Sequence, residues 1–210
     1  RGRGLDRGIG RGWCVDRIAW PTPASPSAPS RGRALMMSAP MPEVMLDRSP
    51  VLAFAGLGGN VGDSARTLRS AVHRLMTVPR SRMVSTSRFY RTPAWGQENQ
   101  ADFVNAAVAI ETALAPRALL NIERDFGRTR AADGSDRWGP RILDLDILLY
   151  GDRSIDEPGL CVPHAYLHER AFALVPLLDL VSDIEIPGRG SARRALAQLD
   201  SAGIESLVER

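Results

Sequence analysis

One segment in the last third of the chain constrains the fold and the chemistry more than any other. Residues 142–150 read Ile-Leu-Asp-Leu-Asp-Ile-Leu-Leu-Tyr, an apolar run that contains Asp144 and Asp146. Because side chains two residues apart in a strand point to the same face, both carboxylates converge while Leu145 points into the core. Two carboxylates in apolar surroundings repel each other unless a cation lies beside them. The segment therefore predicts a buried strand with a divalent-cation site, and the alternative is a solvent-facing pair on an edge strand.

The other regular segments predict how this strand is placed. Four segments are typical of strands: 51–57, 83–90, 103–112 and 142–150. Helices are expected after Asp63 or Ser64 and from Pro116, because a capping side chain or a proline favours a helix N-terminus. The order strand, helix, strand, strand, helix, strand is typical of an α+β, ferredoxin-like βαββαβ core, an antiparallel sheet covered by helices on one face. The C-terminal region adds a short strand and helices near 170–180 and 192–199.

The first 49 residues differ in composition from the remainder. They begin with alternating glycine and arginine and continue with Pro, Ser and Ala, so they hold too little apolar surface to fold. Residues 1–49 carry eight Arg against four acidic residues, whereas 50–210 carry nineteen Arg against twenty. We expect a disordered extension at 1–49 and one folded domain at 50–210. The extension is either dispensable or the result of a translation start assigned too far upstream. RNA binding is an alternative role for the Arg-Gly tract.

The composition also excludes several classes of protein. All 27 basic residues are arginine, which rules out a P-loop lysine, a Schiff-base lysine and a lysine general base. An apolar run of about 18 residues is absent, so a conventional membrane-spanning helix is not expected. Cys14 and Cys161 are too far apart in sequence for a Cys-x-x-Cys metal site. We expect a cytoplasmic enzyme with no membrane partner.

Four arginines lie close in sequence to the aspartate pair, and they are Arg128, Arg130, Arg137 and Arg141. A triphosphate is usually bound by Mg²⁺ that carboxylates and phosphate oxygens share, together with guanidinium groups that neutralise charge. The segment 128–141 is long enough to act as a mobile lid. The alternative is a set of surface arginines that solvate a loop.

A second cluster lies at the start of the third expected strand. Phe103 and Asn105 share a strand face, and residues 92–96 (Thr-Pro-Ala-Trp-Gly) precede them. A flat ring beside an amide suits a planar heterocycle, because the amide offers both a donor and an acceptor. On spacing alone the commoner interpretation is a core phenylalanine, and a single histidine such as His164 is more often structural than catalytic.

Several motifs resemble those of the 6-hydroxymethyl-7,8-dihydropterin pyrophosphokinase family, enzymes of folate biosynthesis. The longest is the stretch 137–148, Arg-Trp-Gly-Pro-Arg-Ile-Leu-Asp-Leu-Asp-Ile-Leu, which is similar to the family's signature. Four further stretches match in the family's order: 89–93, 105–107, 123–128 and 162–164. The resemblance extends over about residues 51–186.

The resemblance implies a ferredoxin-like α+β fold and transfer of pyrophosphate from ATP to the pterin hydroxymethyl group, with release of AMP. It implies ATP as cosubstrate and two Mg²⁺ ions held by Asp144 and Asp146, with Arg128 and Arg130 as catalytic loop arginines. The implied ATP-binding residues are Glu123, Trp138, Arg141, Ile147, His164 and Arg170. The implied pterin-binding residues are Thr92, Pro93, Trp95, Phe103, Asn105 and Phe172, with the ring between the two phenylalanines. We expect a monomer that acts on small molecules and has no nucleic-acid partner.

Two other classes of function stay open on the residues alone. A nucleotidyl transferase with paired aspartates needs a groove for nucleic acid, and the near-neutral charge of 50–210 argues against one. An RNA-binding module on the same fold needs exposed aromatic residues and a basic patch on its sheet. The carboxylates expected on a central strand argue against that module.

Overall fold

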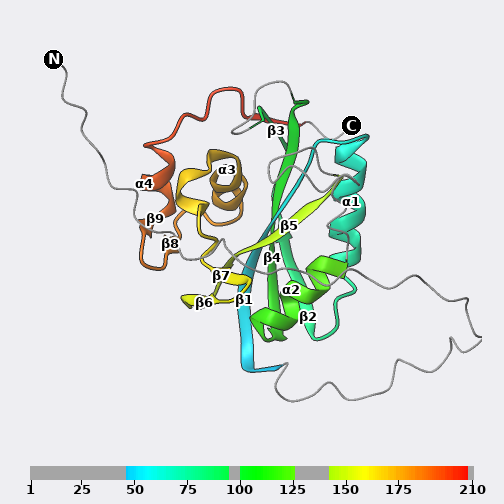
Figure 1. Ribbon diagram of the computed structural model, residues 1–210, viewed down its shortest axis with the longest axis vertical. Coiled ribbons are helices and arrows are strands. Elements are labelled where there is room, and N and C mark those ends of the chain that lie inside the picture. The colour runs from blue at the N-terminus through cyan, green and yellow to red at the C-terminus, as the bar shows by residue number, and fades with distance from the viewer. Residues whose placement is uncertain (1–45, 95–99, 126–141, 208–210) are drawn as a thin grey trace, which may run out of the picture. The chain divides into compact units, whose positions relative to one another are not determined.

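The computed structural model describes residues 46–94, 100–125 and 142–207 (Figure 1). Its strands are β1 (Leu46–Gly59), β2 (Ser81–Thr86), β3 (Tyr90–Thr92), β4 (Phe103–Leu114), β5 (Asp144–Tyr150), β6 (Ile155–Glu157), β7 (Leu160–Val162), β8 (Glu185–Ile186), β9 (Gly190–Ser191) and β10 (Glu205–Ser206). Its helices are α1 (Ser64–Leu75), α2 (Pro116–Asp125), α3 (Ala171–Leu180) and α4 (Ala192–Leu196), with a 3-10 turn at Leu167–Glu169.

The main sheet is antiparallel and has the strand order β10-β3-β4-β1-β5, with β2 paired to β4 on the same side as β3. When β2 and β3 are counted as one interrupted strand, the four core strands have the order expected of a ferredoxin-like sheet, with the first and third at its centre. The predicted α+β class is confirmed. β6–β7 and β8–β9 form two small separate hairpins.

Helix α1 forms where the sequence predicts it. The Asp63 side chain accepts a hydrogen bond from the Arg66 backbone N–H at 3.0 Å, which satisfies one of the donors exposed at a helix N-terminus. Leu68, Ala71 and Leu75 follow the helical period and are buried against the sheet. The amphipathic pattern therefore fixes which face of α1 meets the core.

Helices cover both faces of the sheet, whereas the sequence predicted one. The first face packs against α1 and α2. On the second face, Leu174 and Leu177 of α3 pack with Phe54, Ala109 and Leu148 of three different strands. Figure 1 shows α1 and α3 on opposite sides of the sheet. The reason lies in the sequence of α3, Ala-Phe-Ala-Leu-Val-Pro-Leu-Leu-Asp-Leu, which is apolar almost all round and must be buried.

The segment expected as one strand at 83–90 is instead two strands separated by residues 87–89. Ser87 donates its backbone N–H to the Ala107 carbonyl at 2.9 Å, and Ser87 Oγ accepts the Ala107 N–H, also at 2.9 Å. A side-chain oxygen thus takes the place of a backbone carbonyl in the ladder. The main chain therefore leaves the sheet after Ser87. The alternation of polar and apolar residues cannot predict this interruption.

Strand β5 lies at an edge of the main sheet in the described part of the chain, so the expectation of a central strand was wrong. It begins at Asp144, so Ile142 and Leu143 precede it, although the sequence placed them in the strand. The His164 backbone N–H donates to the Leu148 carbonyl at 3.0 Å, so the chain after β7 covers part of this edge.

Strand β1 begins at Leu46, before the expected domain boundary at residue 50. Residues 1–45 of the expected extension lie outside the described residues. Among the helices that are described, none has the length and apolar character needed to cross a membrane.

Candidate active site

A cleft opens on the α3 side of the sheet. Its floor comes from β1, β3, β4 and β5, and its wall comes from His164 and from the residues that start α3. Four strands and helix α3 therefore contribute to one site. The two clusters that the sequence singled out, the aspartate pair and the Phe103–Asn105 pair, both line it.

Asp144 and Asp146 project from the start of β5 into this cleft. In the β1–β5 ladder Asp144 pairs with Gly58 and Asp146 with Gly56. Both aspartates are half-buried, while Leu145 between them is buried in the core on the opposite face. The predicted convergence of the two carboxylates is confirmed, and it depends on the alternation of a single strand.

Glycines of β1 leave room for these groups. A Cβ on Gly58 would lie 2.7 Å from Asn105 Oδ1, closer than real contacts permit. A Cβ on Gly56 would meet only the end of the flexible Leu148 side chain, at 3.2 Å. Gly58 thus lets the amide of β4 approach β1, and sequence reasoning missed this role. The signal that could have found it is the register, since Gly58 pairs with Asn105 on one side and Asp144 on the other.

The second cluster forms a polar pocket next to an aromatic surface. Asn105 Nδ2 donates a hydrogen bond to Thr92 Oγ1 at 2.8 Å, and both residues are buried. Phe103, two residues along the same strand, is paired with Thr92 and lines the cleft. Phe172 at the start of α3 lines it as well. One amide and two aromatic rings therefore share one cavity, which suits a planar heterocycle with polar edges.

His164 and Arg170 line the same cleft and contact each other. The Tyr166 backbone N–H donates to His164 Nδ1 at 3.3 Å, and Arg170 Nη1 lies 3.4 Å from His164 Nε2. The Arg170 guanidinium also lies over the rings of Tyr166 and Phe172, with 5.4 Å and 5.7 Å to their centroids. The two cation–π contacts help to fix where the Arg170 guanidinium lies at the wall of the cleft.

The expected site residues divide into three groups. Those that line the cleft are Thr92, Pro93, Phe103, Asn105, Asp144, Asp146, His164, Arg170 and Phe172. Those outside the described residues are Trp95, Arg128, Arg130, Trp138, Arg141 and the side chain of Glu123. The Ile147 side chain is buried among the α1 and α2 core, on the other face of β5. Ile147 can therefore reach the cleft only through its backbone.

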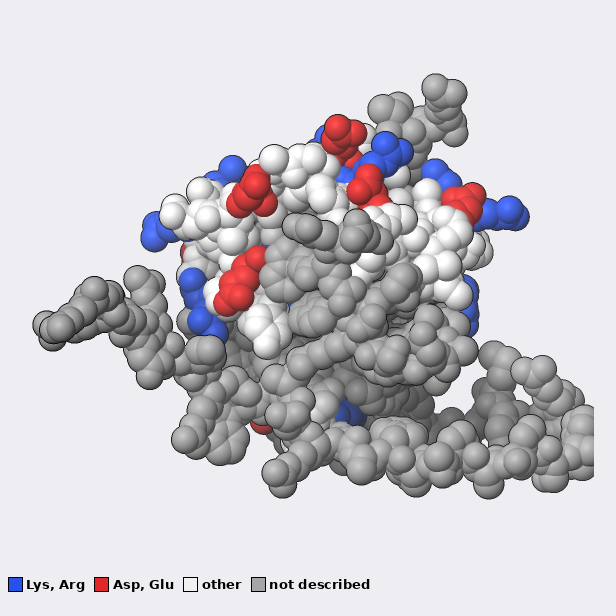
Figure 2. Space-filling view, turned by 45° about the horizontal axis from the view of Figure 1, so that its top comes forward, with Lys and Arg blue, Asp and Glu red and all other residues white. Residues whose placement is uncertain are grey.

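The described charges on the face in Figure 2 are of both signs and are interspersed. Acidic and basic side chains alternate around the rim of that face, without one continuous basic area. A nucleic-acid groove needs a stripe of positive charge along the backbone path. This view offers none over the residues that are described.

Comparisons with known proteins agree on one family. The family model for 7,8-dihydro-6-hydroxymethylpterin-pyrophosphokinase (HPPK) matches residues 54–182. A Methylorubrum extorquens protein named 2-amino-4-hydroxy-6-hydroxymethyldihydropteridine pyrophosphokinase is 46% identical over 159 residues, 74% of this chain and 98% of the relative. Relatives of the same name from Haemophilus influenzae and Pseudomonas aeruginosa are 39% identical, covering 65% and 73% of this chain and 86% and 95% of their own.

Among solved structures, the chain is similar to the Plasmodium falciparum HPPK-DHPS A437G structure with SDX-DHP, with a TM-score of 0.56 and 16% identity. The match covers 74% of this chain and 47% of the other, so this chain spans about half the length of that protein. At this identity the likeness shows the fold. The family model covers more than half of this chain and the Methylorubrum relative is matched over nearly all its length, and the chain therefore belongs to the HPPK family.

Proposed function

We propose that this protein transfers the pyrophosphoryl group of ATP to the hydroxymethyl group of 6-hydroxymethyl-7,8-dihydropterin and releases AMP. Membership of the HPPK family supports the reaction. The observation that carries it in this chain is the cleft, in which a carboxylate pair for a metal–phosphate group lies beside an amide and two aromatic rings for a heterocycle. The reaction needs these two kinds of group side by side.

The described residues fit Mg²⁺. Asp144 and Asp146 offer hard oxygen ligands on one strand face. The described residues contain no larger cluster, of three or more His, Cys, Asp or Glu side chains, that could hold a metal. A pair of carboxylates suits Mg²⁺, which is usually bound through one or two carboxylates and completed by water and substrate phosphates. We propose two such ions. When bound, they would neutralise phosphate charge.

On the pterin side, Asn105 would hydrogen-bond the edge of the ring, and Phe103 and Phe172 would contact its faces. Thr92 keeps the Asn105 amide in place through their 2.8 Å hydrogen bond. Pro93 and Trp95 would complete this side of the pocket. Holding the ring in this way fixes where its hydroxymethyl group lies, which contributes to the rate by orientation.

On the phosphate side, the pterin hydroxyl oxygen would form a bond to the β-phosphorus while the bond from that phosphorus to the AMP oxygen breaks. The hydroxyl proton is released, and no protein base is needed, because such transfers depend mainly on positioning and charge. Arg128 and Arg130 would stabilise the charge that develops on the transferred group. Contacts to the nucleotide are proposed for six residues: Glu123, Trp138, Arg141, Ile147, His164 and Arg170.

We further propose that the protein acts as a monomer in the cytoplasm. Cys161 is a free thiol that is half-buried, which agrees with a reducing compartment. Sedimentation of the full chain tests the first statement, and a dimer as the active form would contradict it.

The activity is tested by product analysis. The full chain is incubated with ATP, Mg²⁺ and 6-hydroxymethyl-7,8-dihydropterin, and the nucleotides are separated by chromatography. Pterin-dependent AMP is the expected product. ADP would mean transfer of a single phosphoryl group, and the absence of a pterin-dependent product from folded protein would overturn the proposal.

A further inference from the structure

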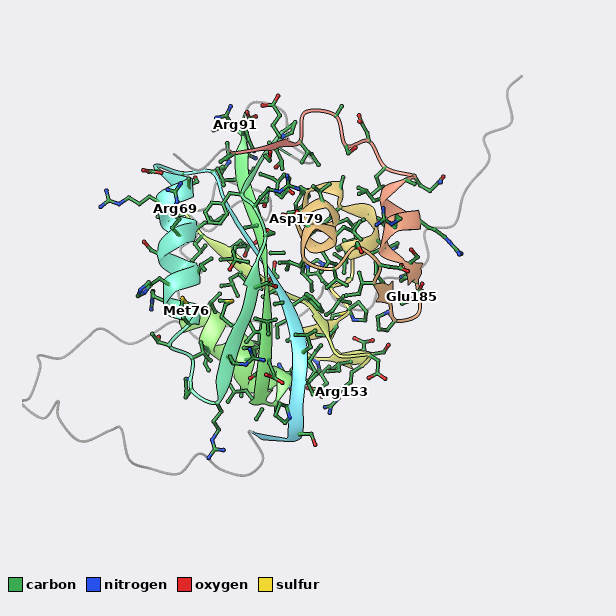
Figure 3. The ribbon with its side chains drawn as sticks, turned by 180° about the vertical axis from the view of Figure 1, so that it is seen from behind. Arg69, Met76, Arg91, Arg153, Asp179 and Glu185 are labelled. Carbon is green, nitrogen blue, oxygen red and sulfur yellow. The ribbon has the colours of Figure 1, made fainter. Side chains whose placement is uncertain are left out.

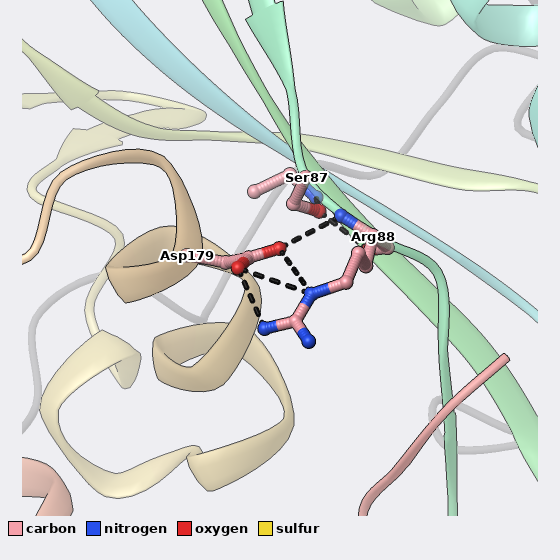
Figure 4. Close-up of polar contacts among 4 residues, drawn as sticks. Ser87, Arg88 and Asp179 are labelled. Atoms are coloured by element: carbon pink, nitrogen blue, oxygen red, sulfur yellow. Dashed lines mark hydrogen bonds and ion pairs between the residues drawn. The ribbon is translucent and has the colours of Figure 1, made fainter. Parts of the chain in front are cut away.

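Four hydrogen bonds join Asp179, near the end of α3, to Arg88 in the interruption between β2 and β3 (Figure 4). The Arg88 backbone N–H donates to Asp179 Oδ2 at 2.8 Å, and Arg88 Nη2 donates to Oδ1 at 2.8 Å. Arg88 Nε lies 3.2 Å from both oxygens. The carboxylate therefore holds the main chain of the interruption as well as a side chain.

The Arg88 backbone N–H is available because of Ser87. Ser87 meets both ladder groups of Ala107 by itself, one with its N–H and the other with Oγ, so the chain leaves the sheet at the next residue. The Phe89 carbonyl then accepts the Leu207 N–H at 2.7 Å. The interruption is thus fixed at three successive residues, and its middle residue is held by α3.

The interruption leads directly to the proposed pterin side of the cleft. Strand β3 is only three residues long, and in its ladder Tyr90 pairs with Asn105 and Thr92 with Phe103. Its other edge pairs with β10 over two residues, so a contact at its start adds to the few ladder pairs that hold so short a strand. Arg88 lies two residues before Tyr90, and its guanidinium is 5.5 Å from the centre of the Tyr90 ring.

Tyr90 pairs with Asn105 in the ladder, and its ring lies beside the Arg88 guanidinium. It is buried, and burial together with the nearby Asp179 charge raises the pKa of its phenol. The Arg88 hydrogen bonds lower the pKa of the Asp179 carboxyl, which keeps the carboxylate charged. Figure 3 shows Asp179 on the side of α3 that faces the sheet. The pair thus joins α3 to the strand that carries Thr92.

The apolar contacts of α3 do not fix its position in the same way. Leu174 and Leu177 stabilise the packing of the helix, but apolar contact is not directional and tolerates small displacements. Hydrogen bonds to a carboxylate fix distance and angle. Asp179 therefore adds a directional contact between α3 and the start of β3 that the leucines do not supply.

We propose that Asp179 is a positioning residue for pterin binding, which acts through the Arg88 main chain to place β3 and the Thr92–Asn105 hydrogen bond. The inference rests on the proposed function for the identity of the ligand. It assigns Asp179 no contact with substrate. Loss of the Asp179 carboxylate should therefore weaken the binding of the pterin and leave the binding of ATP nearly unchanged.

The test compares two carboxylates that each bind an arginine. Glu111 accepts from Arg82 Nη2 at 2.7 Å and Nε at 3.1 Å but does not line the cleft. Asp179→Asn should raise the KM for the pterin about tenfold, the loss of one charge-assisted hydrogen bond, while kcat and the KM for ATP change less than about twofold. Glu111→Gln should change none of them. The proposal would be overturned if both variants changed the pterin KM equally, or if Asp179→Asn raised the KM for the pterin and for ATP equally.

Two further variants separate the backbone contact from the charge pair. Arg88→Ala keeps its backbone N–H, so it should raise the pterin KM less than Asp179→Asn. The double variant Arg88→Asp/Asp179→Arg should not restore the wild-type KM, because an arginine cannot accept the backbone N–H of residue 88. Full recovery in this variant would show that two bare charges suffice and would contradict the proposal.

Hydrogen exchange gives a readout that does not depend on activity. Asp179→Asn should speed amide exchange in β3 more than in β2, whereas Glu111→Gln should not affect β3. If the wild-type chain produces no pterin-dependent AMP, the proposed function is refuted. The exchange measurement would then still test whether Asp179 places β3. An active wild type with unchanged β3 exchange and pterin KM in Asp179→Asn would refute only the positioning role.

Discussion

The two halves of the cleft are built in different ways. The half that carries Asn105 and Thr92 lies on β3 and β4, is buried, and is held by hydrogen bonds between the residues themselves. The half that carries Asp144 and Asp146 lies on an edge strand, where two like charges are brought together. The first half is assembled by packing and hydrogen bonds, and the second brings two acidic side chains to the cleft.

This difference indicates what each half contributes. A preformed amide and aromatic pocket selects a ligand by shape and hydrogen bonds, which determines binding more than rate. Like charges held together cost folding free energy, and such arrangements are typical of sites that perform chemistry. Substitutions in the aspartate half should therefore change kcat, and substitutions in the amide half should change KM.

The largest effect is expected from Asp144→Asn. The rate should fall about a thousandfold, because charge stabilisation at the phosphates is lost. The melting temperature in the absence of Mg²⁺ should stay constant or rise, since repulsion from Asp146 is removed. Steady-state kinetics and thermal unfolding check both results, with Asp152→Asn in the exposed turn after this strand as the control. Activity retained at saturating Mg²⁺ would contradict the metal assignment.

A smaller loss is expected from Arg128→Ala, which the sequence alone assigns to the transfer step. The rate should fall about a hundredfold while ATP affinity falls only a few fold, because a charge that develops in the transition state is left without its donor. Single-turnover kinetics and calorimetric titration with an ATP analogue separate the two quantities. Equal losses in both would place Arg128 in ground-state binding.

The amide half is tested by Gly58→Ala. The added Cβ would lie 2.7 Å from Asn105 Oδ1 and must displace the amide, so the pterin KM should rise about tenfold with a smaller change in kcat. Gly56→Ala is the matched control, because its Cβ meets only a flexible leucine. If both variants bind pterin equally well, the close approach of β1 to Asn105 has no role in binding.

The smallest effect concerns stability and pH. Hydrogen bonds from Arg88 lower the pKa of Asp179, so the carboxylate stabilises the folded state above its unfolded pKa of about 3.9. That contribution should disappear as pH falls through the lower, folded pKa. Since Arg88 is largely exposed, Asp179→Asn should lower the melting temperature at pH 7 by only about 2–4 °C, and the difference should vanish in acid. A difference that grows on acidification would contradict the sign of this shift.

The sequence predicted the helices and strands correctly where a local pattern alone determines the element. Runs of apolar residues located β4 and β5, and the Asp63 cap with the helical spacing of Leu68 and Leu75 located α1. The interruption after β2 could not be found in this way, because it depends on Ser87 Oγ replacing a backbone group of a distant strand. Such an exchange is a tertiary contact, and local patterns do not contain it.

The site was predictable to a similar degree. Asp144 and Asp146 followed from a spacing of two, and the pairing of Phe103 with Asn105 followed from the same rule. The place of α3 was missed, although its nearly uniform apolar sequence indicates burial on more than one side. Because α3 covers the second sheet face, the described part of that face does not offer the open aromatic surface that an RNA-binding module needs.

The most direct test of the account is a crystal structure of the full chain with a non-hydrolysable ATP analogue, Mg²⁺ and 6-hydroxymethyl-7,8-dihydropterin. We expect the pterin ring between Phe103 and Phe172, with its polar edge on Asn105 and the phosphates facing Asp144 and Asp146. A pterin bound outside this cleft, or phosphates bound away from the two aspartates, would contradict it.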